Sequence, residues 1–133
     1  MKIISKGVGI LFKLMEIKED FVTRNLIFKS EISGKCYDVF DDSMLIGDDQ
    51  FDFLKEHNNY DCKFSILGDL SHKGELFECC GTEKIGKKSF IKVKNNNNDY
   101  FYFFTSENIL SDRIRINVLR YDLLAVGKII NDR

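Results

Sequence analysis

The chain has 133 residues, of which 44% are hydrophobic and 13% aromatic, and its formal net charge is −1. This length fits one domain over residues 1–133, and the hydrophobic content is enough for a core, which excludes a disordered chain. The nearly balanced charge excludes a strong overall attraction to nucleic acid or to a membrane surface.

The N-terminal third of the chain is predicted to form strands. Val8–Ile17 fits both strand and helix spacing, and its nearby glycines favour a strand. Alternating apolar residues in Leu26–Ile32 and in Cys36–Phe40 flank the pair Ser33-Gly34. This pattern predicts a β-hairpin with a two-residue loop.

One short helix is predicted over Asp49–His57. Asp48 stands at the capping position, and the acids at its start suit the positive end of a helix dipole. Phe51, Phe53 and Leu54 supply an apolar side, so we expect this helix to pack against the strands.

The rest of the chain alternates apolar and polar residues between turn signals. The predicted strands are Tyr60–Ile66, Glu75–Cys80, Ser89–Lys94, Tyr100–Phe104, Arg113–Val118 and Leu123–Ile130. Turns are expected at Ser71–Gly74, at Gly81–Lys88 and in the asparagine tract Asn95–Asn98. Because no strand–helix–strand alternation occurs, we predict a mainly β (β-rich α+β) domain. It would be an antiparallel meander or a small OB-like barrel with one short helix.

The segment from Gly81 to Ser89 resembles a phosphate-binding loop in its glycine spacing. Lys88 occupies the place of the required hydroxyl residue, however, and Ser89 comes one position late. Such a loop must also lead into a helix, whereas the residues that follow predict a strand. We interpret this segment as a turn.

No metal, cofactor or catalytic site is predicted. The soft ligands lack the paired spacing of zinc sites, and no nucleophile–base signature is present. These ligands are Cys36, Cys62, Cys79, Cys80, His57 and His72. Adjacent Cys79 and Cys80 would point to opposite faces of a strand. We therefore expect free thiols and a protein that is not an enzyme.

No apolar run approaches the ~20 residues that a membrane-spanning helix needs, and the apolar start of the chain lacks a small-residue cleavage site. We therefore expect neither a membrane segment nor a signal peptide. The expected location is the cytoplasm, where cysteines stay reduced.

An acidic surface is the first candidate binding site. Between residues 38 and 61 the only base is Lys55. The candidate residues are Asp41, Asp42, Asp48, Asp49, Asp52 and Glu56. They form either a docking patch for a basic partner protein, where charge speeds association, or an ordinary solvated surface.

An aromatic and basic strand is the second candidate. Tyr100–Phe104 places aromatic rings on both faces of a strand, although a sheet with one wet face buries only one side. The candidate residues are Tyr100, Tyr102, Lys87, Lys88, Lys92 and Lys94. Aromatic rings beside basic side chains are typical of proteins that bind single-stranded nucleic acids. Alternatively, the short helix or the N-terminal segment covers the strand.

The leading functional prediction is a small non-catalytic protein that masks a partner protein. Immunity proteins or antitoxins that neutralise a nuclease toxin, and phage-type inhibitors, belong to this class. The alternative is an OB-like module that binds single-stranded nucleic acid. The net charge of −1 counts against the alternative, because phosphate contacts need a basic surface.

Overall fold

The computed structural model describes residues 11–43 and 50–131, and strands dominate it. The strands are β1 (Leu11–Asp20), β2 (Thr23–Ser30), β3 (Cys36–Asp41), β4 (Asn59–Ile85), β5 (Lys88–Lys94), β6 (Tyr100–Phe103), β7 (Arg113–Val126) and β8 (Ile129–Ile130). They form one mixed sheet in the order β5-β6-β4-β1-β2-β3-β7-β8.

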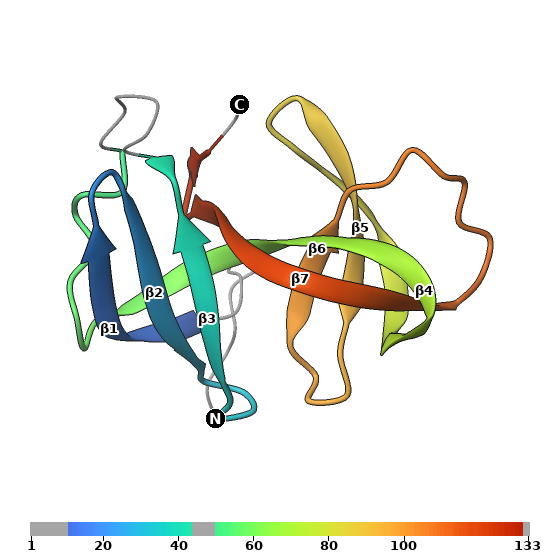
Figure 1. The fold of residues 1–133 in the computed structure, drawn as a ribbon, viewed down its shortest axis with the longest axis horizontal. Helices are drawn as coiled ribbons and strands as arrows, with labels where there is room; N and C mark the ends of the chain where they lie inside the picture. The colour runs from blue at the N-terminus through green and yellow to red at the C-terminus, as the bar shows by residue number, and fades with distance from the viewer. Residues whose placement is uncertain (1–10, 44–49, 132–133) are drawn as a thin grey trace, which may run out of the picture.

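Five of these strands close into a ring, on the left of Figure 1. β1, β2 and β3 form an antiparallel meander, and the start of β4 returns to pair with β1. This spatial order 4-1-2-3 is a Greek key. β7 then closes the ring, parallel to β3 and antiparallel to β4. A five-stranded Greek-key ring is the architecture of an OB-like barrel, so the predicted fold class is confirmed.

β4 and β7 continue beyond the ring and carry the second half of the fold, on the right of Figure 1. They pair with each other from Cys62↔Val126 to Glu78↔Arg113. β5 pairs with the end of β4, and β6 pairs with β5 and with Ser65–Ile66 of β4. Because the same two strands pass through both halves, the halves are one continuous structure.

The core follows from the alternation of side chains along each strand. The apolar positions of the ring point inward, and Phe12, Phe28 and Phe64 are almost completely buried there. Phe101 of β6 joins this cluster, with its ring centroid 5.1 Å from that of Tyr37 and 6.4 Å from that of Phe64. One aromatic core therefore extends from the barrel into the second half.

Two predicted interruptions are absent from the observed strands. The expected turn at Ser71–Gly74 is a bulge within β4, because Leu70 and Glu75 both lie opposite Ile116. Arg113–Val118 and Leu123–Ile130, predicted as two strands, are joined in β7 up to Val126. The turn expected over Gly81–Lys88 is confined to residues 86–87, since Ile85 pairs with Lys88. The chain thus forms fewer and longer strands than predicted.

The predicted helix over Asp49–His57 is wrong for its described part, because residues 50–57 form turns and short irregular links. Phe51 and Leu54 are both buried, and the Leu54 amide donates to the Phe51 carbonyl oxygen. The Lys55 amide donates to the Tyr60 hydroxyl instead of to a helical carbonyl. Core burial of the two apolar residues, rather than helix propensity, determines the local conformation. The β2–β3 loop is also longer than the predicted two residues. The Ser30 amide donates a hydrogen bond to the Lys35 carbonyl oxygen, so the loop begins after Ser30 and ends before Lys35.

Candidate functional site

Two of the predicted acidic residues are buried in the barrel. Asp41 is 1% exposed and forms an ion pair of 2.7 Å with Arg24, which is 6% exposed. The Arg24 guanidinium also donates to the Phe51 carbonyl oxygen. Asp42 is 8% exposed and accepts a hydrogen bond from the Asn131 amide. The expectation that Asp41 and Asp42 belong to an open acidic surface is therefore corrected.

The other predicted acids do not form an open cluster within the described residues. Asp52 and Glu56 are exposed, but the Glu56 carboxylate accepts a hydrogen bond of 2.8 Å from the Ile17 amide at the edge of β1. Asp48 and Asp49 lie outside the described residues. Of the six acids, the described chain thus presents only Asp52 and Glu56 to solvent.

The three central rings of the aromatic strand, those of Phe101, Tyr102 and Phe103, are covered by the chain itself. Phe101 and Phe103 lie in the main core. Tyr102, on the other face, is 5% exposed and packs in a second cluster with Phe90 and Leu124. Burial raises the pKa of its hydroxyl. The covering elements include β7, not the predicted helix, so Tyr102 does not present its ring to a ligand.

The predicted lysines are distributed over several environments. Lys92 lies over the half-buried Tyr100, with 4.6 Å between its ammonium nitrogen and the ring centroid. Lys88 lies 5.1 Å from the ring centroid of Phe104, which is 50% exposed. Lys87 is exposed in the β4–β5 turn, and Lys94 is half-buried. Lys94 lines a recess beside the asparagine loop, and Lys88 lines a different recess, between the two halves of the fold.

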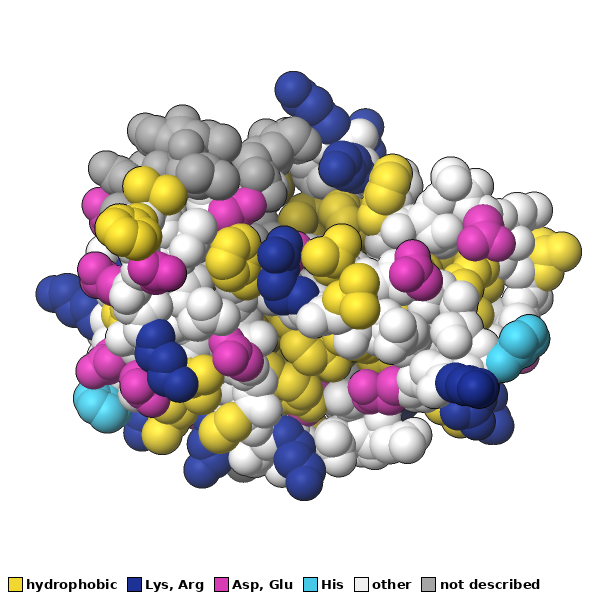
Figure 2. Space-filling view, viewed as in Figure 1, with side chains coloured by type: hydrophobic (Ala, Val, Ile, Leu, Met, Phe, Trp, Pro, Cys, Tyr) yellow, Lys and Arg dark blue, Asp and Glu magenta, His cyan; other side chains and the backbone are white. Residues whose placement is uncertain are grey.

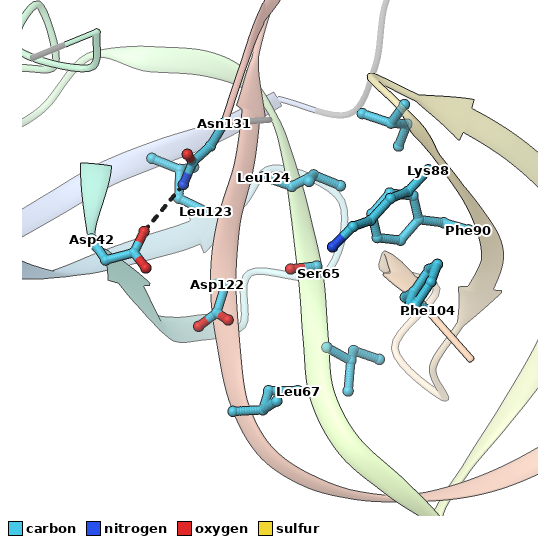
Figure 3. A pocket seen from close by; sticks show the side chains of 12 residues that line it. Asp42, Ser65, Leu67, Lys88, Phe90, Phe104, Asp122, Leu123, Leu124 and Asn131 are labelled. Atoms are coloured by element: carbon cyan, nitrogen blue, oxygen red, sulfur yellow. Dashed lines mark hydrogen bonds between the residues drawn. The ribbon is translucent and has the colours of Figure 1, made fainter. Parts of the chain in front are cut away.

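The recess that Lys88 lines is a cleft of about 200 Å³ between the two halves, shown in Figure 3. Lys88, Phe90 and Phe104 lie on one side, and the ammonium group of Lys88 points toward β4. Asp42, Asp122 and Asn131 lie on the other side, and Ser65, Leu67 and Leu124 lie between the two groups. The cleft therefore combines a basic, aromatic wall with an acidic wall.

An exposed apolar surface adjoins the cleft; we call Phe40, Leu67, Phe104, Leu119 and Arg120 the cleft face. Leu67 is 46% exposed and Leu119 is 64% exposed. The register shifts here, because Leu67 pairs with Arg120 and Gly68 pairs with Val118. This bulge leaves Leu119 unpaired and turns it outward.

Arg120 anchors the centre of the cleft face. Its guanidinium carbon lies 4.2 Å from the ring centroid of Phe40, and its Nε donates to Asp122 at 2.5 Å. Figure 2 shows hydrophobic side chains on both sides of a basic side chain near the middle of this view. Sequence reasoning missed the site, because residues 119–120 fell between two predicted strands. The adjacent exposed Leu119 and Arg120 gave no alternation signal.

The four thiols differ in environment. Cys62 is buried, and burial together with nearby Asp61 raises the pKa of its thiol. Cys79 is half-buried and Cys80 is exposed, at a point where the register of β4 against β5 shifts. Within residues 11–43 and 50–131, no three His, Cys, Asp or Glu side chains gather as a potential metal site. No helix in this part of the chain has the length and apolar character needed to cross a membrane.

Comparison with known proteins gives no relative: the chain matches no protein-family model, no curated protein and no solved structure. The molecule is defined by its fold as a β-rich, barrel-like domain. Any function must therefore be argued from its surface, because fold alone does not determine function.

Proposed function

We propose that this protein is a non-catalytic binding module that covers part of a partner protein with its cleft face. The observation that carries the proposal is the exposure of Leu67, Leu119 and Phe104 around the Arg120–Phe40 stack. Contiguous exposed apolar side chains are a feature of interaction surfaces. Aromatic residues and arginine are also enriched at the centres of protein interfaces.

The geometry changes which residues support this proposal. Asp41 compensates Arg24 inside the barrel, so it contributes nothing to an acidic docking patch. The proposal therefore no longer requires a basic partner. The more specific proposal for the biological role is unchanged. The protein would mask a toxin, as an immunity protein or antitoxin does, or inhibit its partner in the manner of phage proteins.

Site-specific photo-crosslinking tests the proposal. A benzophenone side chain at position 119 should give one dominant crosslinked protein in cells of the source organism. The same probe at position 32 is the matched control, because Ile32 is 55% exposed on the β2–β3 loop, away from the cleft.

The crosslinked protein would then be purified and its affinity measured. Leu119→Ser should weaken binding by about tenfold or more, as expected for a central interface residue. Ile32→Ser should leave the affinity unchanged. Equal crosslinking from positions 119 and 32, or an unchanged affinity of the Leu119 variant, contradicts the proposal.

A second candidate function is binding of single-stranded nucleic acid, favoured by the five-stranded ring together with Lys88 beside Phe104. The carboxylates of Asp42 and Asp122 in the same cleft oppose it. A labelled oligothymidine tests it by fluorescence anisotropy at low and physiological salt. If a base stacks on the exposed ring, Phe104→Ala lowers the affinity by ~1–3 kcal/mol. Ile32→Ala serves as the control.

A further inference from the structure

The cleft between the two halves carries hydrogen-bond acceptors and donors at different places along its lining. Asp42, Asp122 and Asn131 line one side (Figure 3), and we call these three residues the acceptor wall. Lys88 lines the opposite side and Ser65 lies between the two sides, and we call Lys88 and Ser65 the donor pair. Ionised carboxylates only accept hydrogen bonds, whereas an ammonium group only donates them. A ligand that satisfies the whole cleft must therefore donate at one end and accept at the other.

The acceptor wall contains a buried oxygen that lacks a donor. Asp42 directly follows β3 and is 8% exposed, and the Asn131 amide nitrogen donates to its carboxylate at 3.2 Å. This bond fixes the orientation of the Asn131 amide group, so its Oδ1 atom is left as an acceptor. That oxygen is buried and has no hydrogen-bond partner in the described chain. Because a polar atom that loses water without a replacement bond costs free energy, a donor from a ligand would stabilise this wall.

Asp122 adds a second carboxylate to the acceptor wall. It accepts hydrogen bonds from Arg120 at 2.5 Å and 3.2 Å, and its side chain is 27% exposed. A carboxylate has about four lone-pair sites, so these two bonds leave acceptor capacity toward the cleft. Hydrogen bonds between a charged donor and a carboxylate are stronger than those of neutral groups. The acceptor wall therefore favours an ammonium group over an uncharged donor.

The donor pair offers hydrogen bonds to an anionic group. Lys88 is the first residue of β5, and its ammonium group points toward β4, the strand that carries Ser65. Within residues 11–43 and 50–131, no carboxylate forms an ion pair with Lys88, whose ammonium nitrogen lies 5.1 Å from the ring centroid of Phe104. An ammonium group has three donors and a hydroxyl has one. A carboxylate of a ligand can therefore accept from both residues.

The size of the cleft restricts the ligand to a small molecule. Its volume of about 200 Å³ exceeds that of a cavity of about 150 Å³ that binds benzene. It is smaller than the roughly 300–1,000 Å³ of sites for drug-sized ligands. Leu67 and Leu124 lie between the two sides and supply an apolar surface there. These properties fit a short apolar segment with a charged group at each end.

We propose that this cleft binds a small zwitterion of the amino-acid class, with its ammonium group on the acceptor wall and its carboxylate on the donor pair. A ligand with a single charge satisfies only one side and places its apolar end against the charges of the other. The proposal goes beyond protein binding and is tested without a partner protein. Because Leu67 and Phe104 line the cleft and also belong to the cleft face, the bound zwitterion would lie next to the surface that the partner covers.

The test titrates the full chain, labelled with nitrogen-15, with two zwitterions, γ-aminobutyrate and ε-aminocaproate. Butyrate and hexanoate lack the ammonium group, and butylamine and hexylamine lack the carboxylate, so they are the matched controls. We expect at least one zwitterion to bind at least tenfold more tightly than both of its controls, as the loss of a hydrogen bond to a charged group implies. Its amide shifts should include residues 65–67 and 122–124 of the cleft. Absence of zwitterion binding, equal binding of the controls, or shifts confined to other residues overturns the proposal.

Two variants determine which end of the ligand each side binds. Lys88→Met removes the ammonium group but keeps an unbranched side chain, so the zwitterion should bind no more tightly than the matched amine. Asp122→Asn should reduce the preference for the zwitterion over the matched acid at least threefold. Lys84→Met and Asp52→Asn, at exposed residues that do not line the cleft, should leave the affinity unchanged. The amide spectrum of each variant shows whether it is folded. If the folded Lys88 variant keeps the full preference for the zwitterion over the amine, the proposed carboxylate site is wrong.

Discussion

Asp99 and Tyr37 connect the two halves of the fold: the Tyr37 hydroxyl, on β3, donates a hydrogen bond of 2.5 Å to the Asp99 carboxylate, which directly precedes β6. Asp99 is completely buried, and it also accepts hydrogen bonds from the hydroxyls of Ser30 and Ser33. The Asn95 amide in turn donates to the Tyr37 hydroxyl at 2.9 Å. A buried carboxylate is tolerated here because three hydroxyl donors replace water.

Replacement of Asp99 by Ala should strongly destabilise the protein. The change removes the shared acceptor of three hydroxyl groups, and bonds to charged groups are individually worth roughly 1.5–3 kcal/mol. We expect the free energy of unfolding, measured by urea denaturation, to fall by about 3 kcal/mol or more. Asn96→Ala, at an exposed site on the same loop, should change it by less than about 0.5 kcal/mol. Equal effects of the two variants would disprove a structural role for this network.

Stability should fall at alkaline pH. Burial, together with the hydrogen bond to Asp99, raises the pKa of Tyr37 to about 12. An unfolded tyrosine loses its proton near pH 10. The stability that Tyr37 contributes in its neutral form is therefore fully present below pH 10 and is lost as the pH rises toward 12. Burial also raises the pKa of Tyr102 and of Tyr121.

The size of this effect can be measured by comparing the wild type with Tyr37→Phe. Between pH 10 and 11, each such tyrosine should lower the free energy of unfolding by about 1 kcal/mol per pH unit, because the unfolded tyrosine is only half ionised at pH 10. The Phe variant should be less stable at neutral pH but should show a slope smaller by about this amount. Identical slopes for both proteins would show that Tyr37 ionises normally in the folded state.

Removal of one partner of the buried Arg24–Asp41 pair should cost more than removal of one partner of the exposed Arg120–Asp122 pair. Asp41→Asn leaves a buried guanidinium without its counter-charge, which costs about 3–5 kcal/mol. Asp122→Asn, whose pair is partly exposed, should cost less than about 1 kcal/mol. Thermal unfolding monitored by circular dichroism compares the two. If the Asp41→Asn variant is as stable as the wild type, the structural role of Asp41 is wrong, and Asp41 is again a candidate for partner binding.

Gly68 should be less replaceable than Gly34. A β-carbon at position 68 would lie 2.3 Å from the Asn117 carbonyl oxygen, so β4 and β7 would have to separate. We expect Gly68→Ala to lower stability by about 3 kcal/mol. Gly34 has a φ of +75° with open space around it, so Gly34→Ala should cost only the left-handed conformation, about 1–2 kcal/mol. The free energy of unfolding of both variants is measured by denaturation in guanidinium chloride. A larger loss of stability for Gly34→Ala than for Gly68→Ala contradicts the prediction.

Local alternation was sufficient to predict where most strands lie. Tyr60–Ile66 and Ser89–Lys94 lie within β4 and β5, and the tract Asn95–Asn98 lies in the β5–β6 connection. These segments have one buried face, and burial imposes the period of two that the sequence displays. The barrel class followed from the number and spacing of such segments.

What the sequence did not reveal depends on contacts between distant residues. Asp41 is neutralised by Arg24, 17 positions earlier, and nothing in the local sequence indicates this pairing. The helix prediction failed because Phe51 is drawn completely into the barrel core. The cleft face arises where a bulge exposes Leu119, and the position of a bulge depends on the register of two strands far apart in the chain.

The position of β7 also has a consequence for biosynthesis. It is the last strand of the ring in chain order, and it fills the gap between β3 and β4. While a ribosome is still producing the chain, the facing edges of β3 and β4 remain uncovered until β7 has been synthesised. Such edges attract other nascent strands. Productive folding of this protein therefore depends on how rapidly translation delivers residues 113–126 after β4 has emerged.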